Sequence, residues 1–170
     1  SGEDLLGWNL VKQIAQHHEV WTLTHAMNRL GIEQSMRIAP IPNAHFQYID
    51  MPRWLRPMLK YQGTHQIYAY LWQINAYFKA RRLHSQNSFD IFHHVTYAND
   101  WMASYIGALL PVPYIRGPGG GAHRTPRSLK REYSIFGRIW ENIRGWGQWV
   151  LRRDPFFQIG HGKAKALLVC

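Results

Sequence analysis

The chain has 170 residues, of which 46% are hydrophobic and 18% charged, which indicates a folded domain with a hydrophobic core and excludes a disordered chain. The 20 Lys and Arg against 10 Asp and Glu give a formal net charge of +10, which favours an anionic partner such as nucleic acid, a membrane surface or a phosphate-bearing ligand. The one cysteine, Cys170, excludes an internal disulfide.

The first half of the chain alternates helical and strand patterns. Residues 1–7 are interpreted as the loop before a first helix, whose apolar spacing extends over residues 4–17. The elements expected next are a strand at 19–24, a short helix at 27–35, a strand at 45–50, a loop bracketed by Pro52 and Pro57, and a long helix at 62–84.

The second half continues the alternation. It predicts a strand at 89–95, a helix at 99–109, a strand at 111–115, a helical segment at 127–152 interrupted near Gly145 and Gly147, and a last strand at 165–170. Strands that alternate with helices predict an α/β fold with an open, mainly parallel, twisted sheet and helices on both faces. We expect residues 1–170 to form a single domain.

A glycine-rich segment follows the strand expected at 111–115. Gly119, Gly120 and Gly121 leave no Cβ between a ligand and the backbone amides, and glycine readily adopts φ > 0. A helix N-terminus behind such a loop suits phosphate. No Gly-Lys-Ser/Thr follows, so this is not a P-loop, and a tight structural turn is the competing interpretation.

Several polar residues follow predicted strands. In parallel sheets ligands bind at the carboxyl ends of the strands, so we expect the loops that hold His25, Asp50, Thr96 and residues 117–121 to gather along one edge.

Two adjacent histidines, His93 and His94, end the strand expected at 89–95, and their side chains should point to opposite faces. One of them is expected to donate a hydrogen bond to a ligand hydroxyl or phosphate, with a satisfied core histidine as the alternative. The histidine pairs lack the spacing of metal ligands, so we expect no metal site.

Two further segments allow two interpretations each. Gly2, Glu3 and Asp4 form either a second loop at the ligand edge or the acidic start of a helix. Residues 128–157 are basic and aromatic, and suit either an interfacial helix on anionic lipid or an ordinary amphipathic helix packed on the sheet.

Motifs along nearly the whole chain resemble, in order, the N-terminal, acceptor-binding domain of a family-4 glycosyltransferase with the two-domain GT-B architecture. They are SGEDLLGWN, HEVWTLT, FQYIDMPRWL, YAYLWQINAYFKARRL, FDIFHHVTYANDW and LPVPYIRGPGGGAHRTP.

This resemblance implies transfer of a sugar from a nucleotide-sugar donor to a glycan or lipid-linked acceptor, with retained anomeric configuration and without metal or cofactor. A separate Rossmann-like C-terminal domain would hold most of the donor and carry a Glu-x₇-Glu motif. We therefore expect this chain to be a fragment that lacks the first strand and that domain, and to be inactive or nearly so alone.

The resemblance also implies site residues. Gly119–Gly121 match the glycine loop near the donor phosphates, and Gly2, Glu3 and Asp4 match the first glycine-containing loop of the family. His93 and His94 match the strand end near the transferred sugar. It implies a catalytic role for His94 and substrate binding by His93 and Thr96.

The expected setting is cytoplasmic, with the inner face of the membrane as a candidate attachment surface. A nucleic-acid-binding module and a noncatalytic membrane-surface scaffold are the alternatives. No helix-turn-helix, RNA-recognition or zinc-finger signature is present, so nucleic acid is not an expected partner.

Overall fold

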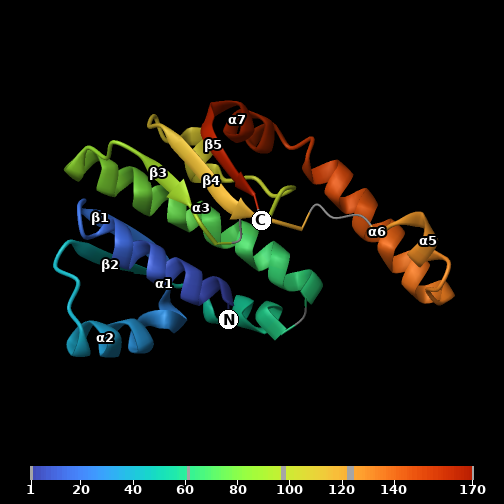
Figure 1. Cartoon of the computed structure of the whole chain (residues 1–170), viewed down its shortest axis with the longest axis horizontal. Coiled ribbons are helices and arrows are strands. Elements are labelled where there is room, and N and C mark those ends of the chain that lie inside the picture. The colour runs from blue at the N-terminus through green and yellow to red at the C-terminus, as the bar shows by residue number, and fades with distance from the viewer. Residues whose placement is uncertain (1, 61, 97–98, 122–124, 170) are drawn as a thin grey trace. The chain divides into compact units, whose positions relative to one another are not determined.

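The computed structural model describes residues 2–60, 62–96, 99–121 and 125–169 (Figure 1). The chain divides into two compact units, Ser1–Gln86 and Asn87–Cys170. Both are built from helices and parallel strands, which confirms the expected α/β class. The described strands lie in two small sheets, with the orders β1-β2 and β3-β4-β5, where the sequence predicted a single sheet.

The first unit holds one two-stranded sheet and the longest helix. Its elements are α1 (Gly2–Ile14), β1 (Val20–His25), η1 (Ala26–Asn28), α2 (Arg29–Ile38), β2 (Ala44–Ile49), η2 (Arg53–Lys60) and α3 (Gln62–Asn87). β1 and β2 pair in parallel, with His25 opposite Ile49 at their carboxyl ends. α1 lies against this sheet, where Trp8 stacks on Phe46 at 5.9 Å between ring centroids.

Two expectations for this unit were wrong. The loop expected at residues 1–7 is replaced by helix from Gly2 onward, because Gly2, Glu3 and Asp4 belong to the first turn of α1, in keeping with the second of the two interpretations given for them. The segment expected as a loop between Pro52 and Pro57 lies largely within the 3₁₀-helix η2, because Leu55 joins a core cluster with Met51 and Tyr68.

The second unit is a three-stranded parallel sheet with β4 in the centre. Its elements are β3 (Phe92–His94), α4 (Tyr105–Leu109), β4 (Tyr114–Gly119), α5 (Arg127–Lys130), α6 (Ile135–Leu151), α7 (Pro155–Lys163) and β5 (Ala164–Val169). Tyr114 is fully buried and lies opposite Phe92 on one side and Ala164 on the other. α4 and α7 pack closely, and a Cβ at Gly160 would lie 3.6 Å from the Ala108 amide nitrogen.

Element boundaries in this unit differ from those expected. The helix predicted at 99–109 is confined to Tyr105–Leu109, because the Ser104 hydroxyl accepts a hydrogen bond from the Gly107 amide at 3.2 Å and caps the helix there. β4 continues into the glycine segment, so part of the expected loop is strand.

The basic segment at residues 128–157 also differs from its expected secondary structure. α6 runs without a break through Gly145 and Gly147, and begins where Ser134 accepts a hydrogen bond from the Gly137 amide at 3.2 Å. α7 was not expected, although Asp154 caps it by accepting from the Phe156 amide at 2.8 Å. Within the described part of the chain, no helix has both the length and the apolarity needed to cross a bilayer.

Candidate functional site

The glycine segment lies at the carboxyl end of the central strand β4. Gly117 and Gly119 are buried within the strand, Gly120 is half-buried and Gly121 is exposed. Gly119 pairs with Val169 of β5, and Gly120 forms a single bridge with Asn99. The segment therefore lies at the edge expected for ligands, but it is an extension of the sheet and not a detached loop.

Gly117 and Gly120 differ sharply in the space around them. Gly117 has φ +112°, and a Cβ there would lie 2.2 Å from the Leu168 carbonyl oxygen, so only glycine fits. A Cβ at Gly120 would meet no atom within 4 Å. Gly117 thus has a structural role, whereas the space beside the Gly120 Cα is open, although the Gly120 carbonyl oxygen accepts a hydrogen bond from the Asp100 amide at 3.1 Å.

His93 is hydrogen-bonded to the glycine segment. Its Nε2 atom lies 2.6 Å from the Gly117 carbonyl oxygen. Because a carbonyl can only accept, Nε2 carries the hydrogen and donates it. When the ring carries a single hydrogen, on Nε2, the Nδ1 atom is left as an acceptor.

His94 lies on the neighbouring strand in register with Arg116. Burial lowers the pKa of His94 to about 4, and the positive charge of Arg116 lowers it further, against a smaller raising effect of the Thr96 backbone. Its Nδ1 atom is buried without a hydrogen-bond partner among the described residues. At neutral pH His94 is therefore an uncharged ring, able to exchange hydrogen bonds but not to supply a proton.

Arg116 is a buried cation in the middle of this unit. It is only 5% exposed, and its Nη2 donates to the carbonyl oxygens of Asn99 and, at 2.6 Å, Met102. Its guanidinium also lies over the Phe157 ring, 5.5 Å from the centroid. These partners are neutral, so they satisfy hydrogen bonds without cancelling the charge.

A small cavity adjoins Arg116 at the ends of β4 and β5. Its volume is about 190 Å³, and it is lined by Asp100, Arg116, Gly119 and His161 together with apolar side chains. Pockets for drug-sized ligands have roughly 300–1,000 Å³. The cavity can therefore take a small group, but not an entire nucleotide-sugar.

The remaining residues predicted for the site are Thr96 and residues 2–4. Thr96 is half-buried in a bend two residues beyond β3. Gly2, Glu3 and Asp4 lie in the other unit, in the first turn of α1. The structure therefore brings together His93, His94, Arg116 and the glycines within the second unit, and the role of residues 2–4 stays a prediction.

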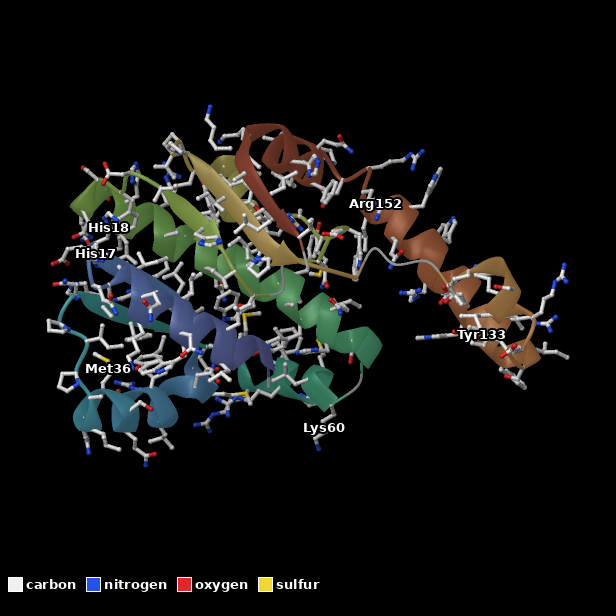
Figure 2. All side chains as sticks on the ribbon, viewed as in Figure 1. His17, His18, Met36, Lys60, Tyr133 and Arg152 are labelled. Carbon is white, nitrogen blue, oxygen red and sulfur yellow. The ribbon has the colours of Figure 1, made fainter. Side chains whose placement is uncertain are left out.

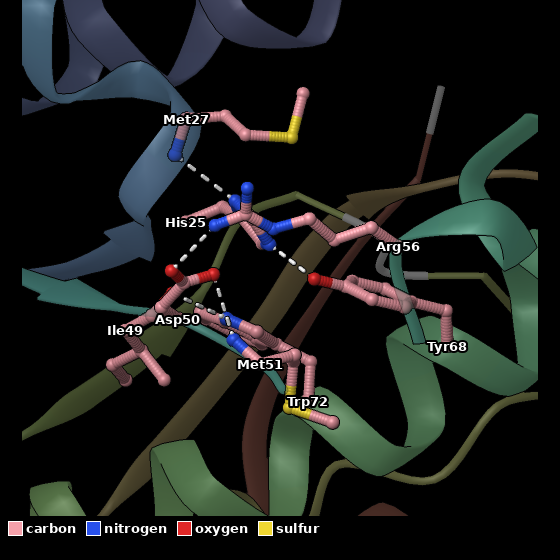
Figure 3. A network of polar contacts seen from close by, with 8 residues as sticks. All are labelled: His25, Met27, Ile49, Asp50, Met51, Arg56, Tyr68 and Trp72. Carbon is pink, nitrogen blue, oxygen red and sulfur yellow. Dashed lines mark hydrogen bonds and ion pairs between the residues drawn. The ribbon is translucent and has the colours of Figure 1, made fainter. Parts of the chain in front are cut away.

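The carboxyl edge of the β1-β2 sheet carries a second polar cluster (Figure 3). His25 ends β1, and its Nδ1 accepts a hydrogen bond from the Met27 amide at 3.1 Å. Nε2 therefore carries the hydrogen and contacts the Tyr68 hydroxyl of α3. Asp50, directly after β2, forms an ion pair with Arg56 at 2.8 Å. His25 and Asp50 thus end neighbouring strands, as expected.

The ionisation of this cluster follows from its contacts. Burial is the largest cause that shifts the pKa of His25, and it lowers that pKa. Asp50 raises the pKa and Arg56 lowers it, each by less than burial does. The pKa of Asp50 is also lowered, first by the hydrogen bond from the Met51 amide and then by Arg56. The carboxylate is half-exposed and the histidine neutral near pH 7, so the cluster presents one ion pair and one uncharged ring at the sheet edge.

Arg116, Arg56 and Tyr68 were not predicted from the sequence as site residues. Arg116 had one available signal, since a cation inside an otherwise apolar strand pattern must find buried partners. Tyr68 lies 43 residues after His25, so no local pattern relates them. Arg56 lies only six residues after Asp50, so its opposite charge was a local signal for their ion pair.

In the described ranges, no group of three or more His, Cys, Asp or Glu side chains is placed to hold a metal ion. Comparisons with protein-family models, with curated proteins and with solved structures found no match to this chain.

Proposed function

We propose that this chain is the acceptor-binding part of a retaining glycosyltransferase, which moves a sugar from a nucleotide-sugar donor to a glycan or lipid-linked acceptor. The proposal rests on the six sequence motifs and is supported by the parallel α/β units, whose finer architecture we propose to be the Rossmann-like half of a GT-B enzyme. The observation that carries it is the open backbone at Gly120, at the carboxyl end of β4 beside two histidines.

This arrangement suits a leaving nucleoside diphosphate. The leaving group gains negative charge as the sugar departs, and preoriented dipoles and nearby cations lower that barrier. The open space beside Gly120 lets phosphate oxygens come close to the backbone. Arg116, whose hydrogen-bond partners are neutral carbonyl oxygens, adds a positive charge near this strand end, where Asp100 lines the same cavity.

The histidines would act as hydrogen-bonding groups in this reaction. A neutral His94 fits a retaining transfer in which no protein side chain must protonate the departing phosphate. His93, fixed by its bond to Gly117, keeps an acceptor nitrogen for a sugar hydroxyl. A separate domain carrying Glu-x₇-Glu would hold the nucleotide, and its closure over the cleft would exclude water.

The test is product analysis with the longest natural protein that contains this chain, supplied with a panel of nucleotide-sugars and candidate acceptors. We expect a glycoside with retained anomeric configuration and a second α/β domain with Glu-x₇-Glu in the protein. Absence of that domain together with absence of transfer would remove the enzymatic proposal.

A matched pair of variants tests the site itself. A Cβ meets no atom within 4 Å at either Gly120 or Gly162, so Gly120→Val and Gly162→Val should both fold. In the longest natural protein that contains this chain, we expect sugar-transfer turnover to fall at least about tenfold in Gly120→Val only, because a side chain there blocks the phosphate. Equal turnover in the two variants would reject a phosphate-facing role for Gly120.

A further inference from the structure

Helix α6 has two chemically different sides. At about 100° per residue, seven of its nine large apolar residues occupy an arc of roughly 140°, and Trp149 and Leu151 lie just beyond its two edges. This apolar arc consists of Ile135, Phe136, Ile139, Trp140, Ile143, Trp146 and Val150. Glu141, Arg144 and Gln148 lie on the opposite side.

The polar side of α6 is the one that contacts the rest of its unit. Gln148 is buried, and its side-chain amide donates to the Gly121 carbonyl oxygen at 3.1 Å. Glu141 accepts a hydrogen bond from the Thr125 hydroxyl, also at 3.1 Å. An amphipathic helix in a globular protein normally turns its apolar face to the core, so this orientation is reversed.

The apolar arc is exposed as a consequence. Phe136 is 85% exposed, Ile135 74%, Trp146 67% and Trp140 63%. Figure 2 shows the side chains of α6 standing out from the ribbon between the labelled Tyr133 and Arg152. A contiguous apolar surface of this kind marks an interaction site.

The flanks of the apolar arc are strongly basic. Residues 127–153 contain seven Lys and Arg but only two Glu. Lys130 and Arg131 precede the helix, and Arg152 and Arg153 follow it. Arg153 also lies over the Trp149 ring, 3.5 Å from its centroid, at the basic end of the helix.

We infer that α6 docks in the plane of an anionic lipid bilayer, with its apolar arc in the acyl boundary and the flanking cations on the headgroups. Charge decides between the possible occupants, since two copies of a chain with net charge +10 would oppose their basic flanks, whereas anionic headgroups neutralise them. Tryptophan prefers the membrane–water interface. The inference rests on α6 alone and holds whether or not the protein transfers sugar.

Vesicle flotation of the 170-residue chain tests this. We expect the chain to float with vesicles of phosphatidylglycerol and phosphatidylcholine, and at least about tenfold less with phosphatidylcholine alone. Phe136→Glu with Ile139→Glu should abolish flotation. The matched control is Leu30→Glu with Ile38→Glu on α2, which replaces two apolar side chains that are also more than half exposed and should float like the wild type.

A second variant tests the basic flank. Lys130→Gln with Arg131→Gln removes two cations and leaves the apolar arc intact, so binding to the anionic vesicles should weaken by at least about tenfold. Circular dichroism of each variant verifies that it is folded.

Three results would overturn the inference. The first is failure of the wild type to float with anionic vesicles. The second is unchanged flotation of the Phe136 and Ile139 variant. The third is a wild type that does not bind lipid but forms a dimer in light scattering, with the dimer lost in this variant. The last result would assign the apolar arc to contact between two copies of the chain.

Discussion

The His93 ring donates a hydrogen bond from Nε2 to the Gly117 carbonyl oxygen at 2.6 Å. This bond connects β3 to the glycine segment of β4. Gly117 cannot be replaced without a clash, and His93 takes its orientation from it. The pair therefore fixes the relative placement of the histidine strand end and the glycine segment, on which the proposed site depends.

Two glycines only three residues apart should respond differently to alanine. Gly117→Ala places a Cβ 2.2 Å from the Leu168 carbonyl at φ +112°, whereas Gly120→Ala meets no atom within 4 Å. We expect Gly117→Ala to destabilise the chain by about 2 kcal/mol or more, and Gly120→Ala by less than about 1 kcal/mol. Urea unfolding measures both, and equal losses would contradict the difference in packing.

His94, which lies in register with Arg116, should make the free energy of unfolding depend on pH. The pKa of His94 is about 4 in the folded chain against the ordinary histidine value of 6.5 in the unfolded chain, so the unfolded chain binds the proton more readily. Its stabilising contribution is fully present above pH 6.5 and is lost as the pH falls toward 4. At pH 5 the loss should be about 2 kcal/mol.

The check is urea unfolding of the wild type and His94→Leu at about pH 7.5 and pH 5. We expect the wild type to lose more stability than the variant over this interval, since the other titrating groups are shared. A parallel loss in both proteins would show that His94 is protonated normally.

Alanine at position 107 should destabilise the folded chain although this position lies in helix α4, because Gly107 is packed against Tyr114. A Cβ at Gly107 would lie 2.7 Å from two atoms of the Tyr114 ring, which is fully buried and stacked on Phe92. We expect Gly107→Ala to destabilise by about 1–3 kcal/mol despite the helix preference of alanine. Gly145→Ala, where nothing lies within 4 Å, should instead be neutral or stabilising in the same thermal unfolding measurement.

The hydrogen bond between the Tyr68 hydroxyl and His25 should stabilise the folded chain. Tyr68 is 3% exposed, and its hydroxyl is the described partner of the His25 Nε2 atom. Tyr68→Phe leaves that donor without its acceptor, so we expect a loss of about 1 kcal/mol in urea unfolding. Tyr133→Phe, which removes a hydroxyl from an exposed ring, is the control, and an equal effect would deny the contact any energetic role.

Much of the secondary structure was predictable because its signals are local. β1 and β2 are runs of β-branched and aromatic residues, and α3 keeps a helical period over many turns. The start of α7 also has a local signal in Asp154 and Pro155, a helix cap followed by proline.

What could not be predicted depends on distant partners. β4 extends into the glycines because Val169 of β5 pairs with Gly119 and Asn99 bridges Gly120, although glycine alone favours a turn. The partners of Arg116 are carbonyls at positions 99 and 102, which no local pattern relates to it. The amphipathic pattern of α6 was visible, but only the contacts of Gln148 and Glu141 show which side faces the protein.

The central claim is that a phosphate-bearing ligand approaches the open backbone at Gly120. The most direct measurement is an amide nitrogen–proton NMR titration of this chain with pyrophosphate and with a nucleoside diphosphate. We predict saturable shifts at the amides of Gly120 and Gly121 and at the rings of His93 and His94. Shifts confined to the arginines of α6, or the absence of shifts at Gly120, would contradict the proposed site.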